Sequence, residues 1–184
     1  GATGSATGVD AGGVALGSTL DLGASFTAVP GGTASWTFTG GTNYTDQSGT
    51  AAIVINKATA VVTVEGYTGT YDALAHGATG SATGIGSVNL SLGLSLGATF
   101  TDVPGGTANW TFEGGTNYMD ESGSVEIIIS QADALVTVTG YTGTYDGLAH
   151  GATGSATGIG SVNLSSGLSL GATFTDVPGG TANW

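Results

Sequence analysis

This 184-residue sequence contains no cysteine, and Lys57 is its only Lys or Arg residue. Without cysteine the chain can form neither a disulfide nor a thiolate nucleophile. Thirteen acidic residues against one basic residue give a net charge of -12. This charge disfavours binding to nucleic acid or to an anionic membrane, since phosphates are neutralised by clusters of Lys and Arg.

Long apolar runs and charged residues are also scarce. No apolar run approaches the roughly 20 residues that a membrane-spanning helix needs. Only 8% of the residues are charged, against about 25% in typical globular proteins. The sequence has no initiator methionine and no signal peptide, and it begins inside a repeated unit. These features predict a window cut from a longer protein.

Glycine, in contrast, is abundant. The 36 glycines follow no three-residue collagen period, and the apolar residues, 40% of the chain, alternate with Thr and Ser. Such alternation is typical of β-strands with one face buried. The composition therefore favours folded β-structure over a disordered glycine-rich linker.

One stretch occurs three times. It reads FTAVPGGTASWTF at 26–38, FTDVPGGTANWTF at 100–112 and FTDVPGGTANW at 174–184. It holds every proline and every tryptophan of the chain, each set spaced by 74 residues: Pro30, Pro104 and Pro178; Trp36, Trp110 and Trp184. Self-similarity at such a period is the signature of a repeat architecture.

The repeat divides the chain into three predicted units. A partial repeat at 1–57 lacks its first strands, a complete repeat fills 58–131, and a partial repeat at 132–184 lacks its last strands. The two ends cover the same part of the repeat and so do not complement each other. We therefore expect a continuous tandem array in which each repeat contacts its neighbours. Strand exchange between short chains is the alternative.

The complete repeat predicts about six strands and no helix. The clearest strands are 60–67, 76–86, 107–114 and 124–130. Gly66 and Gly69 flank a predicted bend, and Pro104-Gly105-Gly106 predicts a turn. Residues 87–97 fit either a strand or a short helical turn. The predicted inward-facing residues are Val62, Val64, Phe100, Val103, Trp110, Phe112, Val125, Ile127 and Ile129.

Two segments resemble a known family. GYTGTYDGLAHGATGSATG at 140–158 and PGGTANWTFEGGTNYMDESGSVEIIIS at 104–130 are similar to the tandem MBG/YDG-type repeats of very large bacterial surface proteins and adhesins. The resemblance implies extracellular all-β modules, Ig-like or β-grasp-like, that serve as stalks or adhesive arrays without enzymatic activity. The chain departs from the pattern at Ala73, where the glycine of YDG is lost.

Two kinds of polar residue recur in each YDG segment. His76 and His150 are the only histidines, and one per repeat cannot build a multi-histidine metal site. We interpret them as polar residues at a strand start, with a pH-sensitive contact as the alternative. Asp72 and Asp146 follow tyrosines, and we interpret them as turn-forming residues.

One loop offers oxygen ligands. Asn117, Asp120 and Glu121 lie close together in the sequence, and carboxylate and amide oxygens are the ligands that Ca²⁺ prefers. These three residues are therefore weak calcium candidates, although the loop lacks the spacing of an EF-hand. A turn closed by Asx and Ser hydrogen bonds is the alternative interpretation.

Trp110 could offer a sugar a stacking platform. Its place in the alternation Ala108-x-Trp110-x-Phe112 favours burial in a core instead.

These observations together predict an all-β chain, a tandem array of small Ig-like β-sandwich modules of about 74 residues, with β-grasp-like modules as the alternative. We expect a structural region of an extracellular bacterial fibre, sheath or adhesin stalk, located outside the cell or at its surface. Neighbouring repeats and other copies in a fibre are the expected partners. Modules that bind a glycan or another surface ligand are the alternative. The chain shows no constellation of catalytic residues and no cofactor motif.

Overall fold

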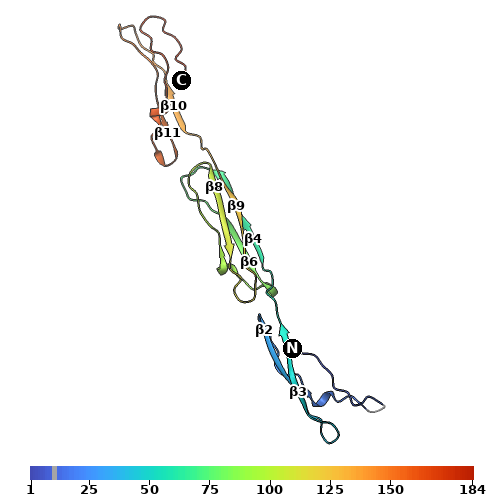
Figure 1. Ribbon diagram of the computed structural model, residues 1–184. Coiled ribbons are helices and arrows are strands. Elements are labelled where there is room, and N and C mark those ends of the chain that lie inside the picture. The colour runs from blue at the N-terminus through green and yellow to red at the C-terminus, as the bar shows by residue number, and fades with distance from the viewer. Residues whose placement is uncertain (10–11) are drawn as a thin grey trace. The chain divides into compact units, whose positions relative to one another are not determined.

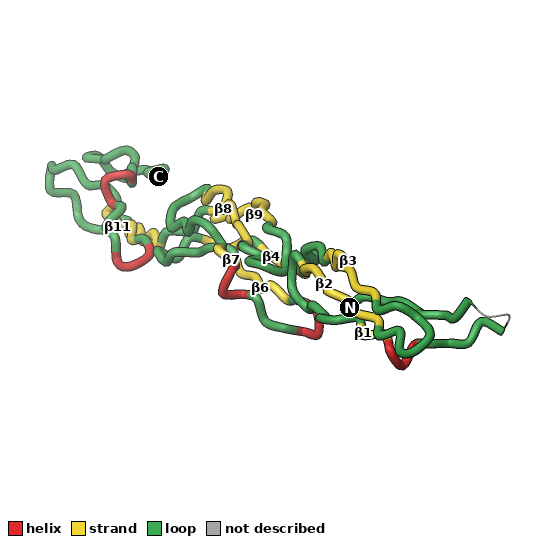
Figure 2. Tube along the Cα trace, turned by 60° about the horizontal axis from the view of Figure 1, so that its bottom comes forward, coloured by secondary structure: helices red, strands yellow, loops and turns green. Residues whose placement is uncertain are grey.

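A computed structural model describes residues 1–9 and 12–184 as strands, turns and short 3-10 helices (Figure 1). Within these residues each helix is only three residues long. Figure 2 shows these short helices in red, set into the loops. The prediction of an all-β chain is thus confirmed.

The first repeat is built on one sheet. Its elements are η1 (Gly17–Thr19), β1 (Leu20–Asp21), β2 (Gly31–Phe38) and β3 (Gln47–Val54). The strand order is β1-β2-β3, with both neighbouring pairs antiparallel. Trp36 lies directly opposite Gly49 across the β2–β3 pair.

The complete repeat carries six strands in two sheets. One sheet pairs β4 with β6, and the other has the order β5-β9-β8-β7. The elements are β4 (Val61–Glu65), β5 (Tyr67–Thr70), β6 (Thr79–Thr83), η2 (Ile85–Ser87), η3 (Ser91–Gly93), β7 (Leu94–Ser95), β8 (Gly105–Phe112) and β9 (Glu121–Ser130).

The third repeat has one two-stranded sheet, in which β10 (Leu135–Thr139) pairs antiparallel with β11 (Thr153–Thr157). The 3-10 helices η4 (Ile159–Ser161) and η5 (Ser165–Gly167) follow β11. They stand at the same repeat positions as η2 and η3. The ambiguous stretch 87–97 is therefore a 3-10 turn that leads into the short strand β7.

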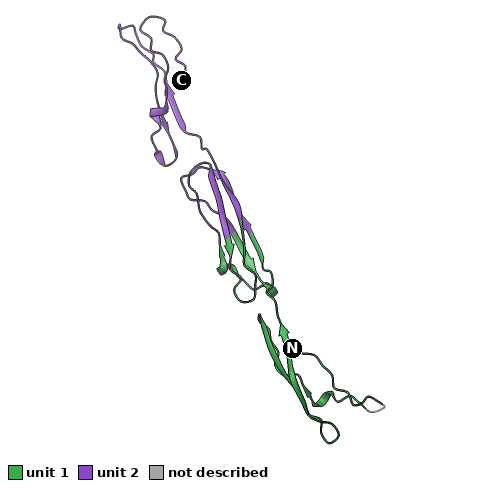
Figure 3. Cartoon of the chain, viewed as in Figure 1, with its two compact units in different colours: residues 1–63, 80–95, 111–123 green, residues 64–79, 96–110, 124–184 purple. Residues whose placement is uncertain are grey.

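Two compact units divide the chain (Figure 3). Unit 1 comprises residues 1–63, 80–95 and 111–123, and unit 2 comprises residues 64–79, 96–110 and 124–184. Each unit takes part of the middle repeat. The repeat boundaries at 57/58 and 131/132 rest on the sequence and stay a prediction.

The core is small and follows the alternation of the strands. In β8 Ala108 is fully buried and Phe112 is 1% exposed, and in β9 Ile127 and Ile129 are 1% exposed. Their neighbours in sequence face solvent, because successive side chains of a strand point to opposite faces. Small residues complete the core, namely Ala34, Ala60, Ala82 and Ala156.

Two details differ from the sequence prediction. Residues 67–70 form a strand, β5, which pairs in parallel with β9, from Tyr67 opposite Ile127 to Thr70 opposite Ser130. The sequence analysis placed a bend there. Val103, predicted to face inward, is 41% exposed. It precedes Pro104 in the turn closed by the hydrogen bond from Gly105 N–H to Asp102 O, and a surface turn offers no core to pack against.

Candidate functional site

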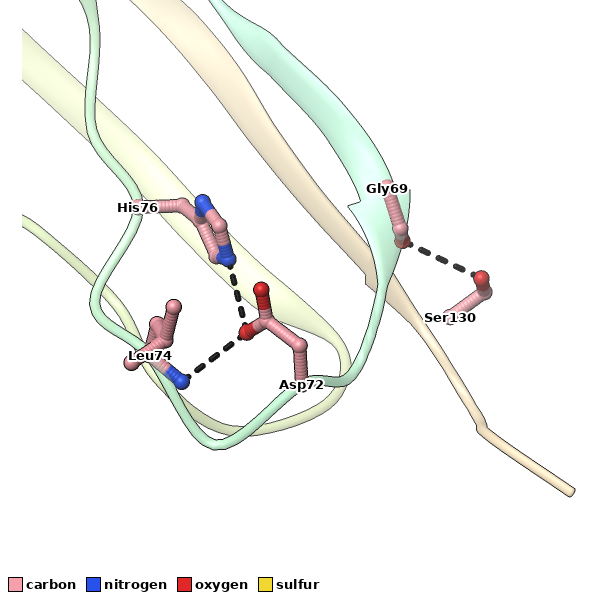
Figure 4. Close-up of polar contacts among 5 residues, drawn as sticks. All are labelled: Gly69, Asp72, Leu74, His76 and Ser130. Atoms are coloured by element: carbon pink, nitrogen blue, oxygen red, sulfur yellow. Dashed lines mark hydrogen bonds and ion pairs between the residues drawn. The ribbon is translucent and has the colours of Figure 1, made fainter. Parts of the chain in front are cut away.

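A cluster of polar and aromatic side chains lies in the YDG segment, and we call Tyr67, Asp72 and His76 the clasp. Asp72 follows β5 and begins a tight turn in which its Oδ1 accepts the N–H of Leu74 at 2.9 Å (Figure 4). This is the Asx geometry expected of a turn-forming aspartate. Ala73, between them, has φ +66°, so the turn keeps its left-handed residue without the glycine of YDG.

The histidine closes the clasp. His76 Nε2 lies 2.9 Å from the same Oδ1 of Asp72 (Figure 4). An ionised carboxylate only accepts, so Nε2 carries the proton in this contact. The backbone of His76 is held by two hydrogen bonds with Phe100, at 2.9 and 2.8 Å. The antiparallel bridge between His76 and Phe100 therefore limits the positions that the imidazole ring can occupy.

A tyrosine covers the ring of the histidine. The rings of Tyr67 and His76 are stacked, with centroids 3.9 Å apart and planes 7° from parallel. The Tyr67 ring also lies against Gly69, where a Cβ would collide with the tyrosine hydroxyl. Gly69 in turn accepts a 3.1 Å hydrogen bond from Ser130 Oγ, which ties β5 to the end of β9 (Figure 4).

The electrostatics of the clasp favour an ionised aspartate. The hydrogen bond from His76, and after it that from the Leu74 N–H, lower the pKa of Asp72 below its ordinary value of 3.8. Hydrogen bonds to the charged form of a carboxyl stabilise that form. The predicted turn role of Asp72 agrees with this geometry, while its contact with His76 was not foreseen.

A second clasp occurs 74 residues later, and both clasps lie in unit 2. Asp146 Oδ1 accepts the Leu148 N–H and contacts His150 Nε2, both at 2.9 Å. Tyr141 stacks on His150 with centroids 3.8 Å apart. The hydrogen bonds from His150 and Leu148 lower the pKa of Asp146 below 3.8. Nothing in the two clasps adds a third metal-binding group: the described residues contain no cluster of three His, Cys, Asp or Glu side chains.

The three calcium candidates have separate surroundings. Asp120 Oδ1 accepts the Gly114 N–H at 2.8 Å and so closes the loop between β8 and β9. Asn117 Oδ1 accepts the N–H of Val29, a residue of the preceding repeat, at 3.0 Å. Glu121 Oε1 is buried and has no hydrogen-bond partner among the residues that the structure describes. Calcium binding stays a prediction.

Two of the three tryptophans are half-buried, whereas Trp184 is 68% exposed. Trp36 and Trp110 occupy the same place in β2 and β8 and share an intermediate exposure. Trp36 lies against Gly49, where a Cβ would come within 3 Å of the indole ring. One ring face is thus covered by a neighbouring strand. The prediction of a packed tryptophan is met only in part.

A hollow lies in the third repeat. It has a volume of about 550 Å³, and its lining includes Tyr141, Tyr145, His150 and Trp184. Residues 141–144 form no strand, whereas their counterparts in β5 pair with β9. The hollow therefore occupies the place that β9 fills in the complete repeat, and it need not be a ligand pocket.

No family model, curated protein or solved structure matches the chain. Among the described residues, no helix is long and apolar enough to cross a membrane.

Proposed function

We propose that the chain is a structural repeat region of an extracellular bacterial fibre, sheath or adhesin stalk, in which β-modules stacked in series act as a spacer. The observation that carries this proposal is the recurrence of local geometry at the 74-residue spacing. The strands β2 and β8 have the same pattern of burial, and the two clasps repeat their distances. A serial array reuses one module, because each module contacts only its neighbours.

The form of each module is an Ig-like β-sandwich in this proposal. The complete repeat carries two sheets, one with strands β4-β6 and one with β5-β9-β8-β7. A β-grasp module would wrap its sheet around a helix, and the described part of residues 58–131 has only 3-10 turns of three residues. The two sheets therefore support the sandwich over the β-grasp alternative.

An extracellular location is supported by the composition. The chain has no cysteine and one basic residue, and its turns are closed by aspartates and backbone groups. A trypsin-like protease would find a single basic cleavage site. The resemblance of the YDG and GGTNY segments to bacterial surface repeats points to the same location.

Electron microscopy of the native material tests the proposal. We expect a regular axial period that corresponds to one repeat. Pulling single full-length chains gives a second measurement: unfolding of the complete 74-residue repeat should release about 250 Å of contour length. Material without an axial period, together with a chain that extends without a discrete step, would contradict a stalk of folded modules.

A glycan-binding module is the second candidate, because Trp110 leaves part of its ring exposed. Aromatic rings with one free face are suited to stacking on a sugar. A glycan array with the wild-type chain, the single variants Trp36→Ala and Trp110→Ala and the double variant tests this candidate, because the two rings share the same exposure. Specific binding that each single variant weakens and the double variant abolishes, without unfolding, would favour binding modules over a purely mechanical role.

A further inference from the structure

Asn117 joins the first repeat to the second. Its side-chain Oδ1 accepts the N–H of Val29, in the Val-Pro-Gly-Gly turn of the first repeat, at 3.0 Å. Its main-chain oxygen accepts the N–H of Ala58 at 2.9 Å, and Ala58 O accepts the N–H of Met119 at 2.9 Å. One residue thus contacts both the connecting segment and the Val-Pro-Gly-Gly turn of the preceding repeat. All these residues belong to unit 1.

The same loop without this contact occurs in the first repeat. Asn43 is the counterpart of Asn117, and both loops are closed by an aspartate, with Asp46 and Asp120 each accepting a glycine N–H at 2.8 Å. The Asn43 side chain makes no hydrogen bond with any part of the chain that the structure describes. The loop therefore closes in the same way with and without the asparagine contact, so this contact serves the preceding repeat rather than the loop itself.

The other two Val-Pro turns show what the contact covers. Val29 is half-buried, whereas its counterparts Val103 and Val177 are 41% and 77% exposed. Beside Val103, within unit 2, lies a hollow of about 460 Å³. Its lining includes Val103 and Ala132, which are the counterparts of Val29 and Ala58, the two residues that Asn117 joins. The remaining lining residues are Tyr71, Asp102 and Gln131.

We propose that the Gly-Gly-Thr-Asn-Tyr loop is a docking element between repeats, and that the hollow beside Val103 is its receiving site on the preceding repeat. The partner is another repeat of this kind, which presents its asparagine to the N–H of the Val-Pro turn. Asparagine suits the role because its amide oxygen accepts the bond without adding charge to a chain of net charge -12. This inference rests on the proposed serial arrangement of the repeats.

Amide hydrogen exchange on the full chain tests the docking contact. Asn117→Ala removes the acceptor of the Val29 N–H but keeps the backbone bonds with Ala58. The Val29 amide should then exchange about fivefold to tenfold faster, the effect of losing one hydrogen bond. The amides of Ala58 and Met119 should stay protected, which shows that the loop remains folded.

Two matched variants complete this experiment. Asn43→Ala makes the same change in the same loop where nothing is docked, and it should leave the Val29 amide unchanged. Asn117→Asp keeps an acceptor at the same place and should retain protection. An unchanged Val29 amide in Asn117→Ala, or an equal effect of Asn43→Ala, would overturn the docking role of Asn117.

The receiving site is tested by lengthening the chain. A further copy of residues 111–131 is attached after Trp184, either with its native asparagine or with alanine at the position equivalent to Asn117. The native version should slow exchange of the Val103 amide by about fivefold to tenfold relative to the alanine version. Equal exchange in the two versions would refute the receiving site. A stalk with an axial period could still exist without this contact, so the two proposals fail separately.

Discussion

Three consecutive isoleucines in β9 allow a sharp test of the fold. Ile127 and Ile129 are 1% exposed, whereas Ile128 between them is 48% exposed. Truncation of a buried isoleucine to alanine removes packed methyl groups and leaves a cavity, at a cost of about 2–5 kcal/mol. The same substitution at a half-exposed position should cost less than about 1 kcal/mol.

The comparison of Ile127→Ala with Ile128→Ala isolates burial. Both variants lose the same side chain in the same strand, so the loss of β-propensity is similar. For a domain of 60–100 residues, 1 kcal/mol shifts the melting temperature by about 4–8 °C. We therefore expect Ile127→Ala to lower the melting temperature by at least about 8 °C, and Ile128→Ala by less than half of that.

Thermal unfolding of the full chain, followed by circular dichroism, measures both shifts. Ile129→Ala serves as a repeat of the buried case and should behave like Ile127→Ala. Equal shifts for Ile127→Ala and Ile128→Ala would refute the reasoning, since they would mean that β9 has no single buried face. A larger shift for Ile128→Ala would mean that the register of β9 is displaced by one residue.

Three further predictions concern the glycines, the clasp and calcium. Gly66→Ala should destabilise the fold by about 1–3 kcal/mol, because a Cβ there would collide with Glu126 O. Gly140→Ala, at the same repeat position, should be neutral, because a Cβ there would meet nothing within 4 Å. Equal melting temperatures of the two variants would contradict this prediction. The lowered pKa values of Asp72 and Asp146 mean that their stabilising contribution is complete above pH 3.8 and disappears as the pH falls through the lower folded pKa. In the double variant Asp72→Asn/Asp146→Asn, the melting temperature should therefore depend less steeply on pH in this acid range. An unaltered slope of melting temperature against pH would count against the clasp. Millimolar calcium should raise the melting temperature if the loop between β8 and β9 binds the ion, and no shift would remove the calcium hypothesis.

The strands with regular alternation could be predicted from the sequence. Ala108 and Phe112 are buried on one face of β8, and Ile127 and Ile129 on one face of β9, as their spacing by two residues indicates. Trp110 shares this face but is only half-buried. A small core has too few layers to enclose an indole ring, and alternation says which face a residue takes but not how deeply that face is covered.

The pairing of β5 could not be predicted in this way. Its sequence, Tyr-Thr-Gly-Thr, contains a glycine between two threonines, and this local pattern predicts a bend. It becomes a strand because β9, about 60 residues further along, offers it a parallel partner from Ile127 to Ser130. Such a non-local pairing leaves little trace in a short window of sequence. The exposure of Val103 has a similar origin, since hydrophobicity alone does not show which side of a turn faces a core.

From the sequence, Asp72 and His76 are interpreted separately, as a turn residue and a strand-start residue, and neither Tyr67 nor the cluster is singled out. The turn role of Asp72 follows from its place in YDG, and the copy with Gly147 makes the turn signal stronger. The contact of Asp72 with His76 depends on the pairing of His76 with Phe100, which no local pattern announces. The one usable signal was the unchanged spacing of tyrosine, aspartate and histidine in the two copies at 67–76 and 141–150.

The aspartates explain how a chain with one basic residue holds its loops without ordinary salt bridges. Within the described structure, the ion-pair contacts are the two between histidine and aspartate. Aspartate carboxylates instead accept backbone N–H groups near the ends of strands and in turns, and hydrogen bonds to an ionised acceptor are stronger than those between neutral groups. Each such bond satisfies a backbone donor in a turn or near a strand end, so these carboxylates take over the role that salt bridges play elsewhere. The aspartates that act in this way are Asp21, Asp46, Asp72, Asp120 and Asp146.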